Sequence, residues 1–267
     1  MALIKDTAIV LRRLDYSETS QVLVMFTRAH GQLRVIAKGV KRATRKKAST
    51  GIDLLEMGGI VFSQRPGSEG GLAIMTEWRQ IENFPLLQRD LSRLYAAQYA
   101  AEVTAQLTEV NDPHVGLYDS LARLLSDLGT RSALAALVTY LWQMLREIGL
   151  VPELSRCMGC GSPIVRDSVV YFSSREGGAI CRDCEPSTVE KRRIEIRVLT
   201  LLQGLRNLAA DGAPPSEFAD APRDDRTSDR EAALKKAFEL LDYHLTETMG
   251  KQARLRGPLM VILNGGR

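Results

Sequence analysis

The stretch AIVLRRLDYSETSQVLVMFTRAHGQLRVIAKGVKR, residues 8–42, decides the fold of the N-terminal third of the chain. Residues 7–16 and 19–31 are rich in Val, Ile, Thr and Phe, and turn residues lie between and after them. Residues 32–39 then alternate apolar with polar side chains, as a half-buried strand does, except that Ile36 breaks the pattern. The stretch therefore predicts three consecutive β-strands.

Two further strand patterns, residues 52–64 and 72–81, lie on either side of a Pro-Gly turn. Five short strands joined by Gly-containing turns predict a small antiparallel barrel. The pair Gly58-Gly59 interrupts the fourth strand, which indicates a bulge or a sharp bend. Four large aromatic side chains of these strands are expected to pack in the barrel core, with base stacking as the alternative: Tyr16, Phe26, Phe62 and Trp78.

From Pro85 onward the apolar residues recur with a helical period. A stripe from Leu87 to Leu107 predicts one helix, Asp112-Pro113 predicts the start of a second, and residues 134–148 predict a third. The short connections between them predict an antiparallel bundle.

Beyond the cysteines, Ser187 with Glu190 and Ser228 with Glu231 have the spacing of capping boxes, which predicts two further helices. Residues 211–228 contain three prolines and are expected to be a linker.

All four cysteines form one pattern, in which two Cys-x2-Cys pairs are separated by twenty residues: Cys157, Cys160, Cys181 and Cys184. Two such turns supply four thiolates, which predicts a closed tetrahedral zinc site with one structural Zn²⁺ per chain. Gly161 allows the first turn to bend so that backbone N–H groups point at the sulfurs. The alternatives are four unliganded thiols or a redox pair, and nothing around either pair resembles a thioredoxin-type strand and helix.

Positive charge is concentrated at the N-terminus, because residues 1–80 hold 13 Lys and Arg against 7 Asp and Glu. Residues 37–49 carry six of these cations and no acidic residue, which favours contact with phosphates over a solvated loop or a targeting signal. The candidate DNA-binding residues are Arg34, Lys38, Lys41, Arg42, Arg45, Lys46 and Lys47.

Sequence patterns of catalysis are missing. The chain has no GxxxxGK[ST] loop, no GxGxxG after a strand and no HxE before a PCxxC. Its three histidines, His30, His114 and His244, are expected to be surface or capping residues. The sequence therefore predicts a protein that is not an enzyme.

No apolar run approaches bilayer length and the N-terminus lacks a signal-peptide pattern, so a cytoplasmic protein is expected.

Four stretches resemble the RecO family of bacterial recombination mediators: residues 8–42, FPLLQRDLSRLYAAQYAAEV (84–103), GLVPELSRCMGCG (149–161) and YFSSREGGAICRDC (171–184). The resemblance implies an α+β protein whose N-terminal OB-fold barrel binds single- and double-stranded DNA. It further implies strand annealing, binding of RecR, contact with the acidic C-terminal tail of single-strand-binding protein (SSB), and loading of RecA. Neither a nucleotide cofactor nor binding to a membrane is expected. The protein is expected in the bacterial cytoplasm, associated with the nucleoid.

These inferences divide the chain into an OB-fold domain (1–81), a helical domain in two parts (82–150 and 187–267) and a four-cysteine zinc module inserted between them (151–186). Two other functions are the alternatives. An RNA-binding or ribosome-associated module would use the same barrel and zinc site. A zinc enzyme would need an exchangeable water ligand, which four thiolates do not leave.

Overall fold

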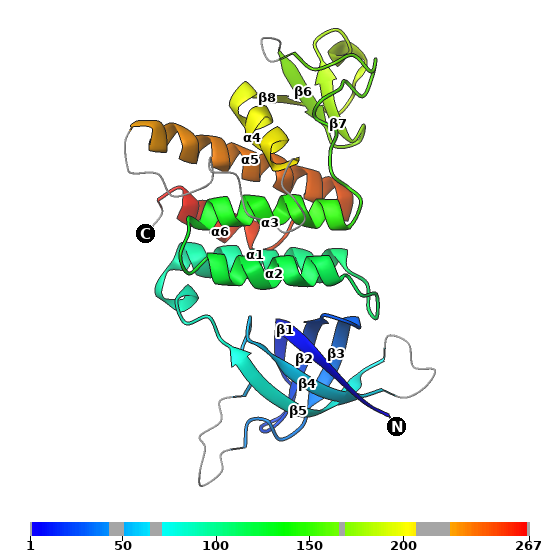
Figure 1. Ribbon diagram of the computed structural model, residues 1–267, viewed down its shortest axis with the longest axis vertical. Helices are drawn as coiled ribbons and strands as arrows, with labels where there is room; N and C mark the ends of the chain where they lie inside the picture. Colours follow the sequence, from blue (N-terminus) through cyan, green and yellow to red (C-terminus); the bar gives the residue numbers. More distant parts are fainter. Residues whose placement is uncertain (1, 43–50, 65–70, 166–168, 207–224, 266–267) are drawn as a thin grey trace. The chain divides into compact units, whose positions relative to one another are not determined.

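The computed structural model describes residues 2–42, 51–64, 71–165, 169–206 and 225–265 (Figure 1). The chain forms two compact units, one of Met1–Thr130 with Ala253–Arg267 and the other of Arg131–Gln252. Among the described residues, no helix has both the length and the apolar character that crossing a bilayer requires.

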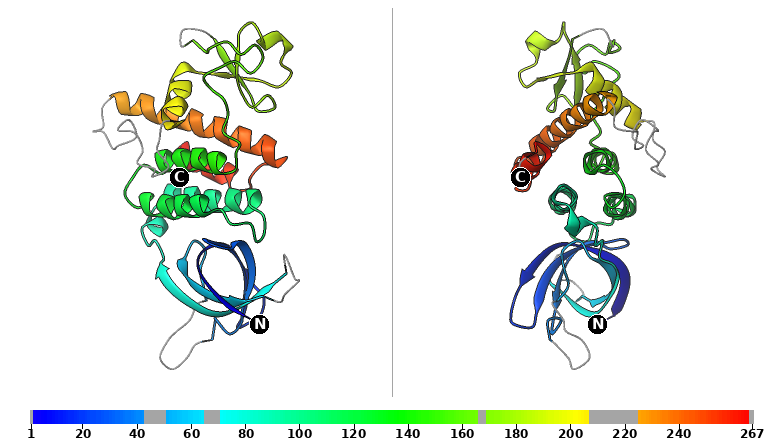
Figure 2. Two further views of the ribbon diagram at one scale, coloured as in Figure 1. Left: turned by 45° about the vertical axis from the view of Figure 1, so that its right-hand side comes forward. Right: turned by 90° about the vertical axis from the view of Figure 1, so that its left-hand side faces the viewer.

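Five strands of the first unit close into a barrel in the order β1-β2-β3-β5-β4, and they surround a common interior in both views of Figure 2. Their bounds are β1 Leu3–Asp15, β2 Gln21–Thr27, β3 Gly31–Ala37, β4 Met57–Ser63 and β5 Ala73–Glu82. Neighbouring strands are antiparallel except for β3 and β5, which pair in parallel. This order and the small closed sheet are those of an OB-fold, so the predicted α+β class with an N-terminal barrel is confirmed.

The barrel core follows from the two-residue period of its strands, because alternate side chains point inward. Leu23 and Met25 of β2 and Leu33 and Val35 of β3 are fully or almost fully buried in this way. Phe62 of β4 completes the same core.

The glycine pair of β4 produces the predicted irregularity. The β4–β5 register shifts between Met57 and Gly58. A Cβ atom on Gly58 would lie 2.6 Å from the Trp78 ring and 2.6 Å from the Arg79 carbonyl oxygen. Glycine is therefore required here for close packing of β5, and the predicted bulge is confirmed.

Helices α1 Leu91–Leu107, α2 Val115–Asp127 and α6 Arg256–Leu263 complete the first unit, together with the 3-10 turn η1 Leu87–Arg89. Asp90 caps α1, since its Oδ1 accepts the N–H groups of Ser92 (2.8 Å) and Arg93 (3.2 Å). The Glu102 carboxylate accepts the N–H groups of Arg254 and Leu255 at 2.8 and 2.9 Å, which fixes the start of α6 to α1.

The second helix begins two residues later than predicted. Its N-cap is His114, and Asp112 makes no N-cap: the Asp112 carboxylate lies 3.1 Å from His114 Nε2. The Asp112 backbone instead packs against Gly31 of the β2–β3 turn, where a Cβ would lie 2.1 Å from the Asp112 oxygen. This packing holds Asp112 and Pro113 outside the helix.

The second unit contains helices α3 Ala133–Glu147, α4 Ile196–Arg206 and α5 Asp225–Met249, and a small sheet in the order β7-β6-β8. The strands are β6 Val170–Ser173, β7 Gly178–Cys181 and β8 Arg192–Ile194, and η2 Glu185–Ser187 precedes β8. Helix α3 packs against α4 and α5.

Both predicted capping boxes of this unit are wrong. Glu190 does not cap a helix, because its Oε2 accepts the Ser173 hydroxyl (2.9 Å) and the Arg175 N–H (3.0 Å) of the β6–β7 turn. The following residues pair with β6, so α4 begins only at Ile196. Helix α5 already begins at Asp225 and runs through Ser228, the last residue of the predicted linker. Residues 211–224 of that linker lie outside the described residues.

Candidate metal centre and nucleic-acid interface

The four cysteines meet at one point of the second unit. Their sulfur atoms all lie within 4.8 Å of one another, and the sulfurs of Cys160 and Cys181 are 3.8 Å apart. Cys181 ends β7, and Cys184 precedes η2. A Cβ on Gly159 would lie 3.0 Å from the Cys184 sulfur, so a side chain at position 159 would crowd the second pair.

Backbone N–H groups surround the buried sulfur of Cys157. Gly161 adopts φ +74° and donates its N–H to the Cys157 carbonyl, which closes the turn as predicted. Burial raises the pKa of the Cys157 thiol, but the N–H groups of Cys181, Cys160 and Gly159 outweigh burial and lower this pKa to about 6. Cys157 is therefore prepared as a thiolate.

The pKa of Cys184 shifts in the opposite direction. Hydrogen bonds with the sulfurs of Cys181 and then Cys160 favour the protonated Cys184 thiol and raise its pKa to about 12. A metal ion held by four thiolates would displace that proton. Zinc–thiolate bonds of about 2.3 Å place tetrahedral sulfurs about 3.8 Å apart, which matches the separation of Cys160 and Cys181. The donor set fits a tetrahedral thiophilic metal ion.

His244 attaches the cysteine-bearing sheet to α5. Its Nε2 lies 3.0 Å from the Leu150 carbonyl oxygen, and its Nδ1 lies 2.7 Å from the Ser174 hydroxyl. A carbonyl can only accept, so Nε2 carries the proton and Nδ1 accepts from Ser174 in the neutral ring. Burial lowers the pKa of His244. Because His244 as a whole is only 5% exposed, the expectation of a surface or capping histidine is wrong here.

A second candidate site lies on the outer face of the barrel, where residues in register on neighbouring strands point the same way. One row runs Leu14–Val22–Ile36–Ile74 across β1, β2, β3 and β5. Leu14 is 66% exposed and Ile74 37% exposed. A parallel row runs Arg12–Val24–Arg34, and both arginines are exposed. Two strand spacings separate them by about 10 Å. An apolar strip bordered by cations results, which we call the barrel face.

The predicted DNA-binding residues fall into three groups. Arg34 lies on the barrel face, and Lys38 and Arg42 are exposed beyond the end of β3. Lys41 lies in the same turn, but its Nζ is 2.9 Å from Asp15 Oδ2. The other three cations, Arg45, Lys46 and Lys47, lie outside the described residues.

The aromatic residues also differ from one another. Phe62 is buried in the barrel core, as predicted, and Trp78 packs against that core. Phe26 is also buried, but outside that core cluster: its ring centroid lies 6.1 Å from that of Tyr118 in α2, so its predicted place inside the barrel is wrong. Tyr16 is 67% exposed beyond the end of β1, so its predicted place in the core is wrong. The strand pattern could not show this, because Tyr16 lies in the β1–β2 turn, where Tyr16 and Ser17 both donate N–H groups to the Ser20 carbonyl.

Comparison with known families agrees with this architecture. The model described as "Recombination protein O N terminal" matches residues 1–84, and "Recombination protein O C terminal" matches residues 88–256. The chain belongs to the RecO family. The resemblance noted in the sequence is thereby confirmed.

Relatives of the chain carry the name DNA repair protein RecO. The protein of Rhodopirellula baltica is 32% identical over 219 residues, which cover 81% of this chain and 79% of that protein. That of Anaeromyxobacter dehalogenans strain 2CP-C is 32% identical over 215 residues, covering 79% and 83%. That of Bacillus pumilus is 31% identical over 184 residues, covering 68% of each chain.

The sequence did not predict Arg12 as a DNA-binding residue. Its place in one row with Arg34 depends on a register shift in β1 between Val10 and Arg12. A bulge of this kind changes which side chains point outward. The period of the strand alone could not locate it.

Proposed function

We propose that this RecO-family chain acts in DNA repair by binding DNA on the barrel face and annealing complementary strands. With RecR it would help to load RecA on SSB-coated single-stranded DNA. The observation that carries the proposal is the Arg12–Val24–Arg34 row beside the exposed Leu14–Val22–Ile36–Ile74 row.

The barrel face has the chemistry that single strands require. OB-folds bind them with a cationic groove that follows the phosphates and with flat side chains under the bases. Arg12 and Arg34 supply the cations, and Leu14 with the exposed Tyr16 supplies apolar and aromatic surface. Phosphate contacts carry no sequence information, so binding is expected to be indifferent to sequence.

Residues 37–49, the basic segment, are proposed to add phosphate contacts to those of the barrel face. Lys38 and Arg42 are proposed to contact phosphates, together with Arg45, Lys46 and Lys47. Lys41 has a second role in this proposal, because its pairing with Asp15 and the hydrogen bond from its N–H to the Thr19 carbonyl (3.1 Å) tie the start of the segment to the β1–β2 turn.

The metal ion is proposed to be one structural Zn²⁺ per chain, held by Cys157, Cys160, Cys181 and Cys184. Bound zinc would cross-link the two Cys-x2-Cys turns. With four sulfur ligands the ion has no open position, so the proposal includes no catalysis by zinc or by any other group.

The domain roles follow from these two sites. Residues 1–81 would bind nucleic acid, and the zinc module, 151–186, would interrupt a helical domain formed by 82–150 and 187–267. The acidic C-terminal tail of SSB is proposed to bind within residues 82–250 and not to the barrel.

An annealing assay on SSB-coated complementary strands tests the proposal directly. The wild-type chain should accelerate annealing, and the Arg12→Gln/Arg34→Gln variant should lose most of that acceleration. Competition with RNA oligomers of the same sequence separates this function from an RNA-binding module. Equal annealing by wild type and variant, or a preference for RNA, would contradict the proposal.

A further inference from the structure

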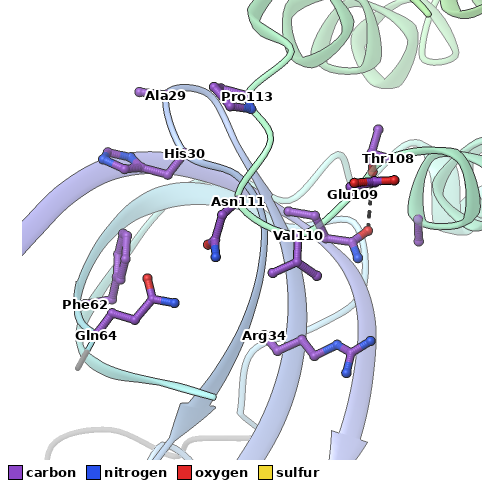
Figure 3. Close-up of a pocket in the computed structure, with 12 residues that line it drawn as sticks. Ala29, His30, Arg34, Phe62, Gln64, Thr108, Glu109, Val110, Asn111 and Pro113 are labelled. Atoms are coloured by element: carbon purple, nitrogen blue, oxygen red, sulfur yellow. Dashed lines mark hydrogen bonds between the residues drawn. The ribbon is translucent and has the colours of Figure 1, made fainter. Parts of the chain in front are cut away.

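A groove of about 1000 Å³ opens in the first unit beside the barrel (Figure 3). The β2–β3 turn, the end of β4 and the α1–α2 connection line it. This volume is at the upper end of the ~300–1,000 Å³ that small-ligand sites occupy. The polar side chains in its wall include His30, Arg34, Gln64 and Asn111.

The groove exists because β3 and β5 pair over a short length. Their register runs only from Val35 to Ala37. Beside the earlier part of β3 lies the α1–α2 connection, where Val110 bridges to Gln32 and the Asn111 N–H donates to the Gln32 carbonyl at 3.0 Å. These contacts fix the backbone of Val110 and Asn111 against β3.

The amide side chains of Asn111 and Gln64 line the groove. Asn111 has φ +62°, a left-handed backbone conformation that asparagine adopts more readily than most residues. Figure 3 shows the amides of Asn111 and Gln64 pointing into the space between the connection and β4. An amide offers both donors and an acceptor, so it can meet the hydrogen-bonding edge of any base.

An aromatic ring and a cation accompany these amides. His30 Nδ1 lies 2.7 Å from Asp6 Oδ2, and the ring meets Phe62 edge-on with centroids 5.7 Å apart. The imidazole is thus held in place while 39% of its side chain stays exposed. Arg34 lines the groove and also belongs to the barrel face, so the two surfaces are continuous.

We propose that this groove binds one unstacked nucleotide of a single DNA strand. The base would meet the amides of Asn111 and Gln64 and stack on His30, as bases do on exposed imidazoles. The phosphate would lie at Arg34, away from the Glu109 carboxylate beside Thr108. The inference rests on the proposed DNA binding and adds a subsite that contacts a base without selecting its identity.

The test compares an oligothymidine with an abasic strand of equal length, which keeps the phosphates and lacks the bases. Fluorescence anisotropy gives both affinities for the full chain. The wild type should prefer the intact strand, and Asn111→Gly should reduce that preference about fivefold, the value of one neutral hydrogen bond. Its salt slope should be unchanged. Glycine suits the positive φ of position 111, and Asn83→Gly, on the exposed chain after β5, is the matched control.

A second measurement needs no variant. Free thymidine monophosphate added to the wild-type chain should shift the backbone amide resonances of His30 and Asn111. If those resonances stay in place and Asn111→Gly keeps the full preference for intact DNA, the subsite is wrong, although salt-dependent DNA binding would survive. If neither strand binds, the proposed function fails as well.

Discussion

The Lys41 ammonium lies 2.9 Å from the Asp15 carboxylate, so one of the six clustered cations is paired within the protein. The hydrogen bonds from Lys41 and then Gln21 lower the pKa of Asp15. Gln21 is itself buried, and its Oε1 accepts the Ile52 N–H at 2.9 Å. The pair therefore belongs to a small network that joins the chain on both sides of the basic segment.

Lys41 and its neighbour Arg42 are expected to differ on substitution. Arg42→Gln removes an exposed cation and should lower the salt slope of single-strand binding by about 0.7, the value of one phosphate contact. Lys41→Gln should change the slope less and increase hydrogen exchange at the backbone amides of residue 41 and Ile52, which donate to Thr19 and Gln21, since it breaks the Asp15 network. Filter binding at several salt concentrations and hydrogen exchange measure the two effects. Equal slopes for both variants would contradict this division of roles.

The fit of β3 against the α1–α2 connection gives a prediction about stability. Gly31 has φ +68°, and a Cβ there would collide with the Asp112 backbone. Gly31→Ala should lower the free energy of unfolding by about 2–4 kcal/mol. Gly59→Ala is the control, because a Cβ at Gly59 meets nothing within 4 Å. Urea denaturation measures both, and an equal loss for the two variants would contradict the argument.

Loss of the proposed zinc ion should lower the thermal stability of the second unit. We expect Cys157→Ser to abolish stoichiometric zinc and to lower the melting temperature by at least about 5 °C. Metal analysis and calorimetry give both values. The Arg12→Gln variant serves as control, since it should retain about one zinc per chain. A metal-free wild type that melts at the same temperature would exclude a structural zinc.

His244 predicts a pH dependence of stability. Its pKa is lowered by burial, so between this folded-state value and the unfolded value near 6.5 the unfolded chain binds more protons. Stability should therefore be fully present above pH about 6.5 and decrease as the pH falls below it. His244→Gln should reduce this loss. Melting temperatures at pH 7.5 and 5.5 test it, and an equal pH shift in variant and wild type would contradict the assignment.

The sequence predicted the elements whose information is local. The barrel strands, the first three helices and the cysteine cluster all appeared in residue periodicity or spacing. Glu190 failed as a helix cap because its partners, Ser173 and Arg175, come from a distant turn. Helix α6 was missed, since Gly257 and Pro258 resemble helix breakers and its start is held by Glu102.

The candidate sites divide in the same way. The outward position of Arg34 could be predicted because residues 32–35 of its strand alternate regularly. Arg12 could not, because its position on the barrel face depends on a bulge and on two strand registers. The sequence predicts a surface histidine at position 244, although His244 is buried, because no pattern near it in the chain indicates Ser174 or Leu150 as its hydrogen-bond partners.

The salt dependence of single-strand DNA binding tests the central claim most directly. The Arg12→Gln/Arg34→Gln variant loses two cations from the barrel face, so the slope of log K against log salt should fall by about 1.4. Arg79→Gln/Arg89→Gln removes the same charge from exposed positions elsewhere in the first unit and should leave the slope nearly unchanged. A slope that is unaltered in the first variant, or reduced equally in both, would show that DNA does not bind on the barrel face.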